Sequence, residues 1–143
     1  MEAVMEINCS SYSDNMIEVL KIFKQIEWDI YNPQGEVEYL PVGDDDMYNW
    51  QCEKISESKL YDIVSEKMAL KERIGANLVY ENGIEGRSLL AETPKQIVLG
   101  ISVNRRIRKG RYTDMAWYLE NIIYKLLDIG VRLLSYELME YED

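Results

Sequence analysis

The chain has no histidine, and among its 143 residues it has only two cysteines, three prolines and one phenylalanine. Without histidine it lacks the commonest general base near neutral pH, the Ser-His-Asp and Cys-His arrangements, and the commonest transition-metal ligand. A GxxxxGK[ST] phosphate loop is also missing, and no GxGxxG sequence follows a strand-like segment. We therefore expect a protein that is not an enzyme and that uses no cofactor.

Long apolar runs are missing too, since no stretch approaches the roughly 18 consecutive apolar residues of a membrane span. The first residues, MEAVMEINCS, have no basic segment followed by an apolar one, which argues against a secretory signal. Cys9 and Cys52 have neither a CxxC spacing nor a histidine partner, so we predict two reduced thiols in a cytoplasmic protein. The length predicts a single globular domain over residues 1–143.

Basic residues are scarce in the first half of the chain. Residues 1–66 contain 15 acidic and 4 basic residues, a balance of −11, whereas residues 67–143 contain 11 acidic and 12 basic residues, a balance of +1. The net charge of −10 therefore comes entirely from the first half. Such a field repels nucleic acid and speeds the encounter with a basic partner, although an acidic surface also serves solubility alone.

The stretch from Gln25 to Glu53 has eight acidic residues and no lysine or arginine, and tyrosines and tryptophans lie among the acids. Tyrosine and tryptophan give large contact areas with few rotatable bonds, and they are enriched at binding surfaces. We predict that this stretch binds a protein partner. Whether Trp28 belongs to the core or to the binding surface is left open. The predicted partner-binding residues are Trp28, Asp29, Tyr31, Glu36, Glu38, Tyr39, Asp44, Asp45, Asp46, Tyr48 and Trp50.

Hydrophobic periodicity predicts an α+β fold, with a mainly antiparallel sheet of about five to six strands and three helices in the order β-α-ββ-α-βββ-α-β. The predicted strands are residues 3–9, 28–31, 36–40, 76–81, 87–93, 96–104 and 131–140. The predicted helices cover residues 14–26, 56–73 and 115–129, with N-caps at Ser13 or Asp14, Ser56 or Ser58, and Thr113 or Asp114. The tyrosines expected to pack within the sheet and helices are Tyr80, Tyr118, Tyr124 and Tyr136.

Two strand segments carry specific expectations. The sequence Asn32-Pro33-Gln34-Gly35 fits a type I turn, so residues 28–31 and 36–40 are predicted to form a hairpin with acids on one face. The last strand has apolar residues on both faces at its start, which predicts an interior position in the sheet. The third helix has the widest apolar stripe, and we expect it to lie across the sheet.

Asp44, Asp45 and Asp46 form the one cluster that could bind Mg²⁺ or Ca²⁺. The spacing fails the EF-hand pattern, because the sixth position counted from Asp44 is Asn49 and the twelfth is Ile55. Consecutive aspartates also have poor propensity for helix and for strand. The preferred interpretation is an exposed, solvated acidic loop, and no metal site is predicted.

The segment RRIRKGR has the opposite charge. Its five positive residues are Arg105, Arg106, Arg108, Lys109 and Arg111. Such a cluster can bind phosphate, but the net charge of −10 opposes stable binding to DNA or RNA. Two other interpretations of this segment stay open. It could be a solvated loop between a strand and a helix, or it could contact the acidic face of a second copy in a homo-oligomer.

A small, acidic α+β protein without catalytic equipment, carrying the segment IEWDIYNPQGEVEYLPVGDDDMYNW, resembles the immunity proteins of bacterial toxin systems. The resemblance rests on size, charge and this segment. No motif allows the functional residues of that family to be assigned to positions in this chain. It implies a bacterial protein that binds a cognate toxin domain, often a basic nuclease, and blocks it. Two alternatives stay open: a phage-type inhibitor that mimics nucleic acid, and a small enzyme that uses carboxylates and a divalent metal.

Overall fold

Eight strands form one antiparallel sheet in the computed structural model, which describes residues 2–9, 15–80, 85–93, 95–101 and 105–142. The strands are β1 (Glu2–Cys9), β2 (Trp28–Asp29), β3 (Val37–Tyr39), β4 (Gln51–Glu53), β5 (Ile74–Tyr80), β6 (Glu85–Thr93), β7 (Gln96–Ile101) and β10 (Leu133–Tyr141). Their order across the sheet is β10-β1-β7-β6-β5-β3-β4, and β2 pairs with β5. The predicted α+β class and antiparallel sheet are confirmed, with more strands than the five to six expected.

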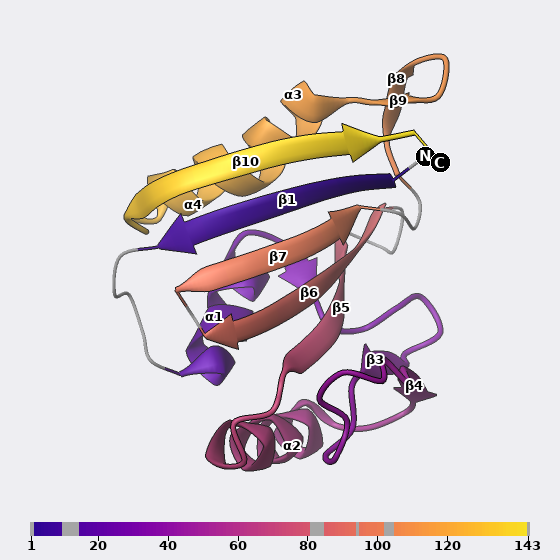
Figure 1. Ribbon diagram of the computed structural model, residues 1–143, viewed down its shortest axis with the longest axis vertical. Helices are drawn as coiled ribbons and strands as arrows, with labels where there is room; N and C mark the ends of the chain where they lie inside the picture. Colours follow the sequence, from indigo (N-terminus) through magenta and orange to yellow (C-terminus); the bar gives the residue numbers. More distant parts are fainter. Residues whose placement is uncertain (1, 10–14, 81–84, 94, 102–104, 143) are drawn as a thin grey trace.

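Three helical segments accompany the sheet within the described residues. They are α1 (Met16–Gln25), α2 (Glu57–Ala69) and a continuous third helix made of α3 (Met115–Tyr118), a π-helical turn η1 (Leu119–Ile123) and α4 (Tyr124–Asp128). In Figure 1, α1 and the third helix lie behind the sheet, and α2 lies at the end where β5 begins. A small separate hairpin, β8 (Ile107–Lys109) and β9 (Tyr112–Thr113), precedes the third helix.

The alternation of residues along β1 explains why one face of the sheet forms the core. Ala3, Met5, Ile7 and Cys9 are buried, whereas the residues between them are only partly buried. Strand β7 shows the same alternation, and the register sets Met5 directly opposite the buried Leu99. Successive side chains of a strand point to opposite faces, so this period places one apolar face under the helices.

The helices begin at residues whose side chains accept hydrogen bonds from their first turns. Ser56 accepts from the backbone of Lys59 at 3.0 Å, and Asp114 accepts from that of Trp117 at 3.2 Å, so two of the predicted caps are confirmed. Asn15, rather than residue 13 or 14, caps α1. Those two residues lie outside the described residues.

An aromatic cluster joins the third helix to the sheet. The Trp28 ring lies 4.8 Å from the Tyr80 ring and 6.2 Å from the Trp117 ring, measured between centroids. Trp28 Nε1 donates to the backbone carbonyl of Asn121 at 3.1 Å, within the π-helical turn. This hydrogen bond ties the indole of β2 to the backbone of the third helix.

The predicted hairpin over residues 28–40 is wrong in its pairing. The turn itself is present, since the Gly35 N–H donates to the Asn32 carbonyl at 2.9 Å. The two arms, however, each pair with β5, and among the described residues they meet only in an isolated bridge between Tyr31 and Val37. Local sequence correctly indicated the turn, and long-range pairing with β5 then decided the strand partners.

The predicted interior position of the last strand is also wrong. Strand β10 lies at the edge of the sheet and pairs with β1 alone among the described strands. Consistent with this edge position, Tyr136 is 43% exposed, and Tyr124 on the neighbouring helix α4 is 48% exposed. Of the four tyrosines expected to pack in the sheet and helices, Tyr80 and Tyr118 are buried, whereas Tyr124 and Tyr136 are about half exposed.

Candidate binding site at the Asp44 loop

Residues 41–50, here called the Asp44 loop, connect β3 to β4 around a buried lysine. Lys67 of α2 has only 1% of its surface exposed. Its ammonium group donates to the carbonyl oxygens of Pro41 and Asp44, each at 2.7 Å, and lies 3.7 Å from the Glu72 carboxylate. A buried charge is stable only when such partners replace water, so these contacts tie the loop to α2.

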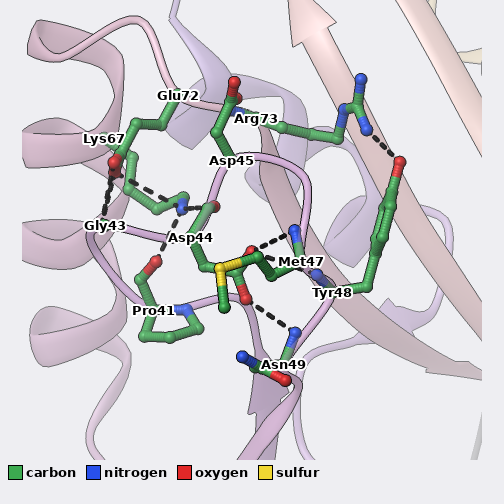
Figure 2. Close-up of polar contacts among 10 residues, drawn as sticks. All are labelled: Pro41, Gly43, Asp44, Asp45, Met47, Tyr48, Asn49, Lys67, Glu72 and Arg73. Atoms are coloured by element: carbon green, nitrogen blue, oxygen red, sulfur yellow. Dashed lines mark hydrogen bonds and ion pairs between the residues drawn. The ribbon is translucent and has the colours of Figure 1, made fainter.

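The Asp44 carboxylate folds the rest of the loop around itself. Its Oδ1 accepts from the backbone N–H groups of Met47 at 3.0 Å and Tyr48 at 3.1 Å, and its Oδ2 accepts from that of Asn49 at 2.7 Å. Tyr48 has φ +55°, a left-handed conformation that costs a non-glycine residue about 1–2 kcal/mol. The three hydrogen bonds hold the backbone in this conformation (Figure 2).

Two residues that follow α2 fasten the outside of the loop. The Glu72 carboxylate accepts from the Gly43 N–H through both oxygens, at 2.8 and 2.9 Å, and Gly43 has φ +93°, where glycine is favoured. Asp45 Oδ1 accepts from the Arg73 N–H at 2.7 Å. The Arg73 guanidinium donates to the Tyr48 hydroxyl and lies 5.4 Å from the centre of its ring. Figure 2 shows this closed set of contacts around the loop.

This framework leaves the tip of the loop exposed. Asp45 and Asp46 are exposed, Met47 is 67% exposed, and Tyr48 is 44% exposed. Leu70, at the adjoining end of α2, is 57% exposed. Two carboxylates thus stand beside apolar and aromatic side chains on a backbone that is fixed by buried hydrogen bonds.

A hollow of about 290 Å³ lies between the loop and the sheet. Its lining residues are Tyr48, Arg73, Leu90, Ala91, Gln96 and Val98. Gly75 permits the chain that enters the loop to approach the sheet, because a Cβ there would lie 2.7 Å from Leu40 and 2.8 Å from Leu90. The volume of the hollow is at the lower end of the roughly 300–1,000 Å³ of typical small-molecule sites, and it is large enough to receive a side chain of a partner.

Three of the predicted partner-binding residues are buried, which corrects the prediction. Trp28 is 1% exposed and packs in the aromatic cluster, and Tyr39 is 6% exposed and lies opposite Ala76 on the core side of the sheet. Asp44 is 5% exposed, because its carboxylate is turned inward onto the loop backbone. These three side chains hold the structure together and are not available to a partner.

The remaining predicted residues fall into two sets. The exposed set is Asp45, Asp46 and Tyr48, and the half-buried set is Asp29, Tyr31, Glu36, Glu38 and Trp50. In the second set, the Tyr31 hydroxyl donates to the Ile55 carbonyl at 3.1 Å, and Glu38 accepts from the Asn77 side chain at 3.2 Å. Glu38, the acid within β3, does lie on the face opposite the buried Val37 and Tyr39, as the alternation predicted.

Cys52 lies on β4 opposite Glu38 and is exposed, whereas Cys9 is buried, and both thiols are free. Partial burial and then the negative charges of Glu36 and Glu38 raise the pKa of the Cys52 thiol above its ordinary value. Burial alone raises the pKa of Cys9. Neither thiol therefore has the lowered pKa that marks an activated nucleophile.

The basic segment forms the hairpin β8–β9 rather than an unstructured loop. Arg105 donates to Thr113 Oγ1 at 2.7 Å and to the Glu140 carboxylate of β10 at 3.2 Å. The Glu140 carboxylate also accepts from the Thr113 N–H at 2.9 Å. The hairpin is thus anchored near the end of β10, and it keeps Arg108 and Lys109 exposed.

Sequence reasoning missed the residues that build the framework of the loop, namely Lys67, Glu72 and Arg73. One signal could have placed the lysine. Lys67 follows the buried residues Leu60 and Val64 at helical spacing, so it occupies the apolar face of α2. For the other two, the contacts arise from the way the loop folds back on α2, and helical periodicity carries no information about that.

The metal site considered for the three aspartates has no support in the geometry of the loop. Both oxygens of the Asp44 carboxylate already accept backbone N–H groups. Within the part of the chain that the structure describes, no group of three or more potential metal-ligating side chains is placed to hold a metal ion. The aspartates are thus divided between one structural residue and two exposed ones.

A scan against protein-family models found no matching family, and searches of curated proteins and of solved structures found no match. In the described ranges, none of the helices has the length and apolar character that crossing a membrane requires. The function proposed below rests on the contacts of the Asp44 loop and on the distribution of charge.

Proposed function

We propose that this chain is a non-catalytic binding protein that neutralises a cognate basic protein, in the manner of the immunity proteins of bacterial toxin systems. Its partner would be a toxin domain, with a basic nuclease as the favoured class, and the encounter would take place in the cytoplasm. The observation that carries the proposal is the exposed pair Asp45 and Asp46 beside Met47 and Tyr48 on a rigid loop.

Rigidity of the loop favours binding. A flexible loop loses conformational entropy when a partner orders it, and this loss weakens the complex. Here Lys67 and Asp44 hold the loop by buried and partly buried hydrogen bonds before any partner arrives. Because the loop is already ordered in the free protein, binding should cause little further loss of its conformational entropy.

The charge of the surface and its shape are expected to affect different steps of binding, namely association and dissociation. The acidic field of the first half of the chain steers a basic partner towards the loop, which raises the association rate. Tyr48 supplies an aromatic anchor, and the adjoining hollow of about 290 Å³ can receive a side chain from the partner. Mutations of the acids and of the tyrosine should therefore affect different rate constants.

The test begins with a pull-down from native cells at low salt, followed by purification of the captured protein. Binding kinetics are then measured with wild type and two loop variants. Asp45→Asn/Asp46→Asn should slow association about tenfold and flatten its salt dependence. Tyr48→Ala should instead speed dissociation about tenfold or more.

Matched controls are available elsewhere on the surface. Asp62→Asn/Glu120→Gln removes the same charge from exposed positions outside the loop, and Tyr112→Ala removes a tyrosine that is 54% exposed. Both controls should bind with nearly wild-type rates. If the loop variants bind like the controls, the loop is not the contact surface. Release of the partner by added DNA or RNA would place the contact at the partner's nucleic-acid site.

A further inference from the structure

We propose that the outer edge of β10 is the contact of a two-fold homodimer, in which the β10 strands of two copies pair antiparallel and extend the sheet. This interaction is separate from the partner surface proposed above. Strand β10 is nine residues long and pairs only with β1 among the described strands. Figure 1 shows it as the outermost strand, with the third helix running behind it.

The composition of β10 favours pairing with another strand. An edge strand has a row of backbone N–H and C=O groups without strand partners, and proteins protect such edges with charged residues (lysine above all), proline, bulges or very short strands. The sequence LLSYELMEY is long and contains no lysine, arginine or proline. Two of its large side chains are also exposed, since Leu134 is 65% exposed and Tyr136 is 43% exposed, whereas Leu133, Leu138 and Met139 are half-buried. Leu127 of the adjacent helix α4 adds a further exposed side chain, at 47%.

A second copy of the same strand fits this edge. When two β10 strands run antiparallel about a two-fold axis at Tyr136, Leu134 of each copy lies opposite Leu138 of the other. Ser135 lies opposite Glu137, so the glutamates do not meet. Because the two-fold axis passes between the two Tyr136 residues, equivalent side chains of the two copies point to the same face of the extended sheet. The register of β10 against β1 shifts at Leu134, because Ser135 lies opposite Asn8 and Leu133 lies opposite Cys9. The centre of the proposed pairing, from Ser135 to Glu137, is regular.

Charges at the two ends of β10 are complementary in the same arrangement. The hairpin β8–β9, with exposed Arg108 and Lys109, is anchored at Glu140 near the end of the strand. Helix α4 ends near the start of the strand, with the exposed Asp128 and the negative end of the helix dipole. Antiparallel pairing brings each basic hairpin to the end of the other copy's α4, and Arg132 comes near Glu140.

The net charge of the whole chain does not oppose this dimer strongly. Residues 105–143, which form the hairpin, the third helix and β10, contain seven basic and seven acidic residues, a balance of zero. Most of the excess negative charge belongs to residues 25–66, which contain 11 acidic and 2 basic residues and include β3 and β4 at the other edge of the sheet. Repulsion across that distance is largely screened at physiological ionic strength, where the Debye length is about 8 Å. Self-association is therefore placed at the end of the molecule with the least charge.

The oligomeric state is the first test. Sedimentation equilibrium over a wide concentration range should give wild type a mass of twice 16.8 kDa. Leu134→Lys should raise the dimer Kd about tenfold or more, because it places two charges at the interface. Met47→Lys is a matched control with 67% exposure on the Asp44 loop, and it should remain dimeric. Circular dichroism confirms that both variants fold. A wild type that stays monomeric throughout, or a Leu134→Lys protein as dimeric as wild type, would overturn the proposal.

Cross-linking tests the register. In a Cys52→Ser background, Tyr136→Cys would place two thiols directly opposite each other at about 4.5–5.5 Å between Cα atoms, within the range of a disulfide. Oxidation should give a covalent dimer on a non-reducing gel. Ser135→Cys is the neighbouring control, and it should cross-link poorly because each thiol would face Glu137. Efficient cross-linking by the control and not by Tyr136→Cys would exclude this register. Failure of the partner-binding test leaves these results unaffected, since the two tests use different variants.

Discussion

At the scale of single residues, Lys67 is the buried charge on which the Asp44 loop depends. Replacing it by methionine keeps much of its volume and removes the ammonium group that contacts Pro41, Asp44 and Glu72. We expect Lys67→Met to destabilise the protein by about 2–4 kcal/mol, because two carbonyls and a carboxylate lose their buried partner. Urea denaturation followed by circular dichroism measures this change.

Lys59 provides the comparison for that variant, since it lies on the same helix and is exposed. Lys59→Met should change the free energy of unfolding by less than about 0.5 kcal/mol. Equal stability of the Lys67 and Lys59 variants would mean that the buried lysine contributes nothing net. In that case, desolvation of its charge would cancel its contacts with the loop.

A second residue-scale prediction concerns the exposed thiol. Glu36 and Glu38 help to raise the pKa of Cys52, so they suppress its thiolate at neutral pH. Glu36→Gln/Glu38→Gln should lower that pKa and speed the reaction of native protein with an aromatic disulfide reagent. In wild type, one thiol should react readily and the buried Cys9 should follow only on unfolding. The control Asp62→Asn/Glu66→Gln removes the same charge from α2, and an equal acceleration there would indicate a general field effect.

At the scale of elements, one ion pair connects α1 to α2 and makes a pH-dependent contribution. Glu57 of α2 accepts from the Tyr61 hydroxyl and from Lys24 of α1 at 3.0 Å, and these hydrogen bonds lower the pKa of Glu57. The folded-state pKa lies below the unfolded value of about 4.3. The stabilisation is therefore complete above that value and is lost as the pH falls through the folded-state pKa.

Glu57→Gln should accordingly reduce stability near neutral pH by less than about 1 kcal/mol, since the pair is partly exposed. The difference from wild type should shrink as the pH falls below about 4.3. Urea denaturation at a series of pH values measures it, with Glu66→Gln on the same helix as the control. A difference that stays constant down to low pH would contradict the assignment to the Glu57 carboxylate.

The π-helical turn gives a second prediction at this scale. Trp28→Phe removes the indole N–H that donates to the Asn121 carbonyl and leaves space in the aromatic cluster. We expect a loss of about 1–3 kcal/mol in the free energy of unfolding. Trp50→Phe, at a half-buried position, should cost less than half as much. A larger effect at Trp50 would mean that the aromatic cluster is not the more tightly packed of the two sites.

The sequence predicted elements whose periodicity is local, and it missed contacts between distant segments. The alternation in β1 and β7 and the capping residues Ser56 and Asp114 were all readable from neighbouring residues. The burial of Trp28 was not, because its partners Tyr80 and Asn121 lie far along the chain. The edge position of β10 was missed for the same reason, since apolar residues on both faces fit an interior strand and a dimer edge equally well.

The three aspartates show the same limit within the candidate site. Composition predicted an exposed acidic loop that included all three aspartates, and only Asp45 and Asp46 are exposed. It could not separate these from Asp44, which has the same chemistry and differs only in facing the backbone of Met47 and its neighbours. The local sequence around Lys67 gives only one indication that this lysine is buried and holds the loop, namely its position on the apolar face of α2.

At the scale of the whole molecule, the order of strands separates the two proposed surfaces. The Asp44 loop connects β3 to β4 at one edge of the sheet, and β10 is the strand at the other edge. Six steps of about 4.8 Å between neighbouring strands put these edges roughly 29 Å apart. A partner on the loop and a second copy on β10 therefore occupy opposite ends of one sheet, and neither blocks the other.

We expect this arrangement to give a complex of two chains and two partner molecules. Light scattering of the purified complex should give the mass of that assembly, and Leu134→Lys should give a complex of one chain and one partner. The Kd for the partner should be the same in both, because a substitution at β10 changes no contact of the Asp44 loop. If the partner instead dissociated the wild-type dimer, the two surfaces would be coupled, either through overlap of a large partner with β10 or through a change in the sheet between them.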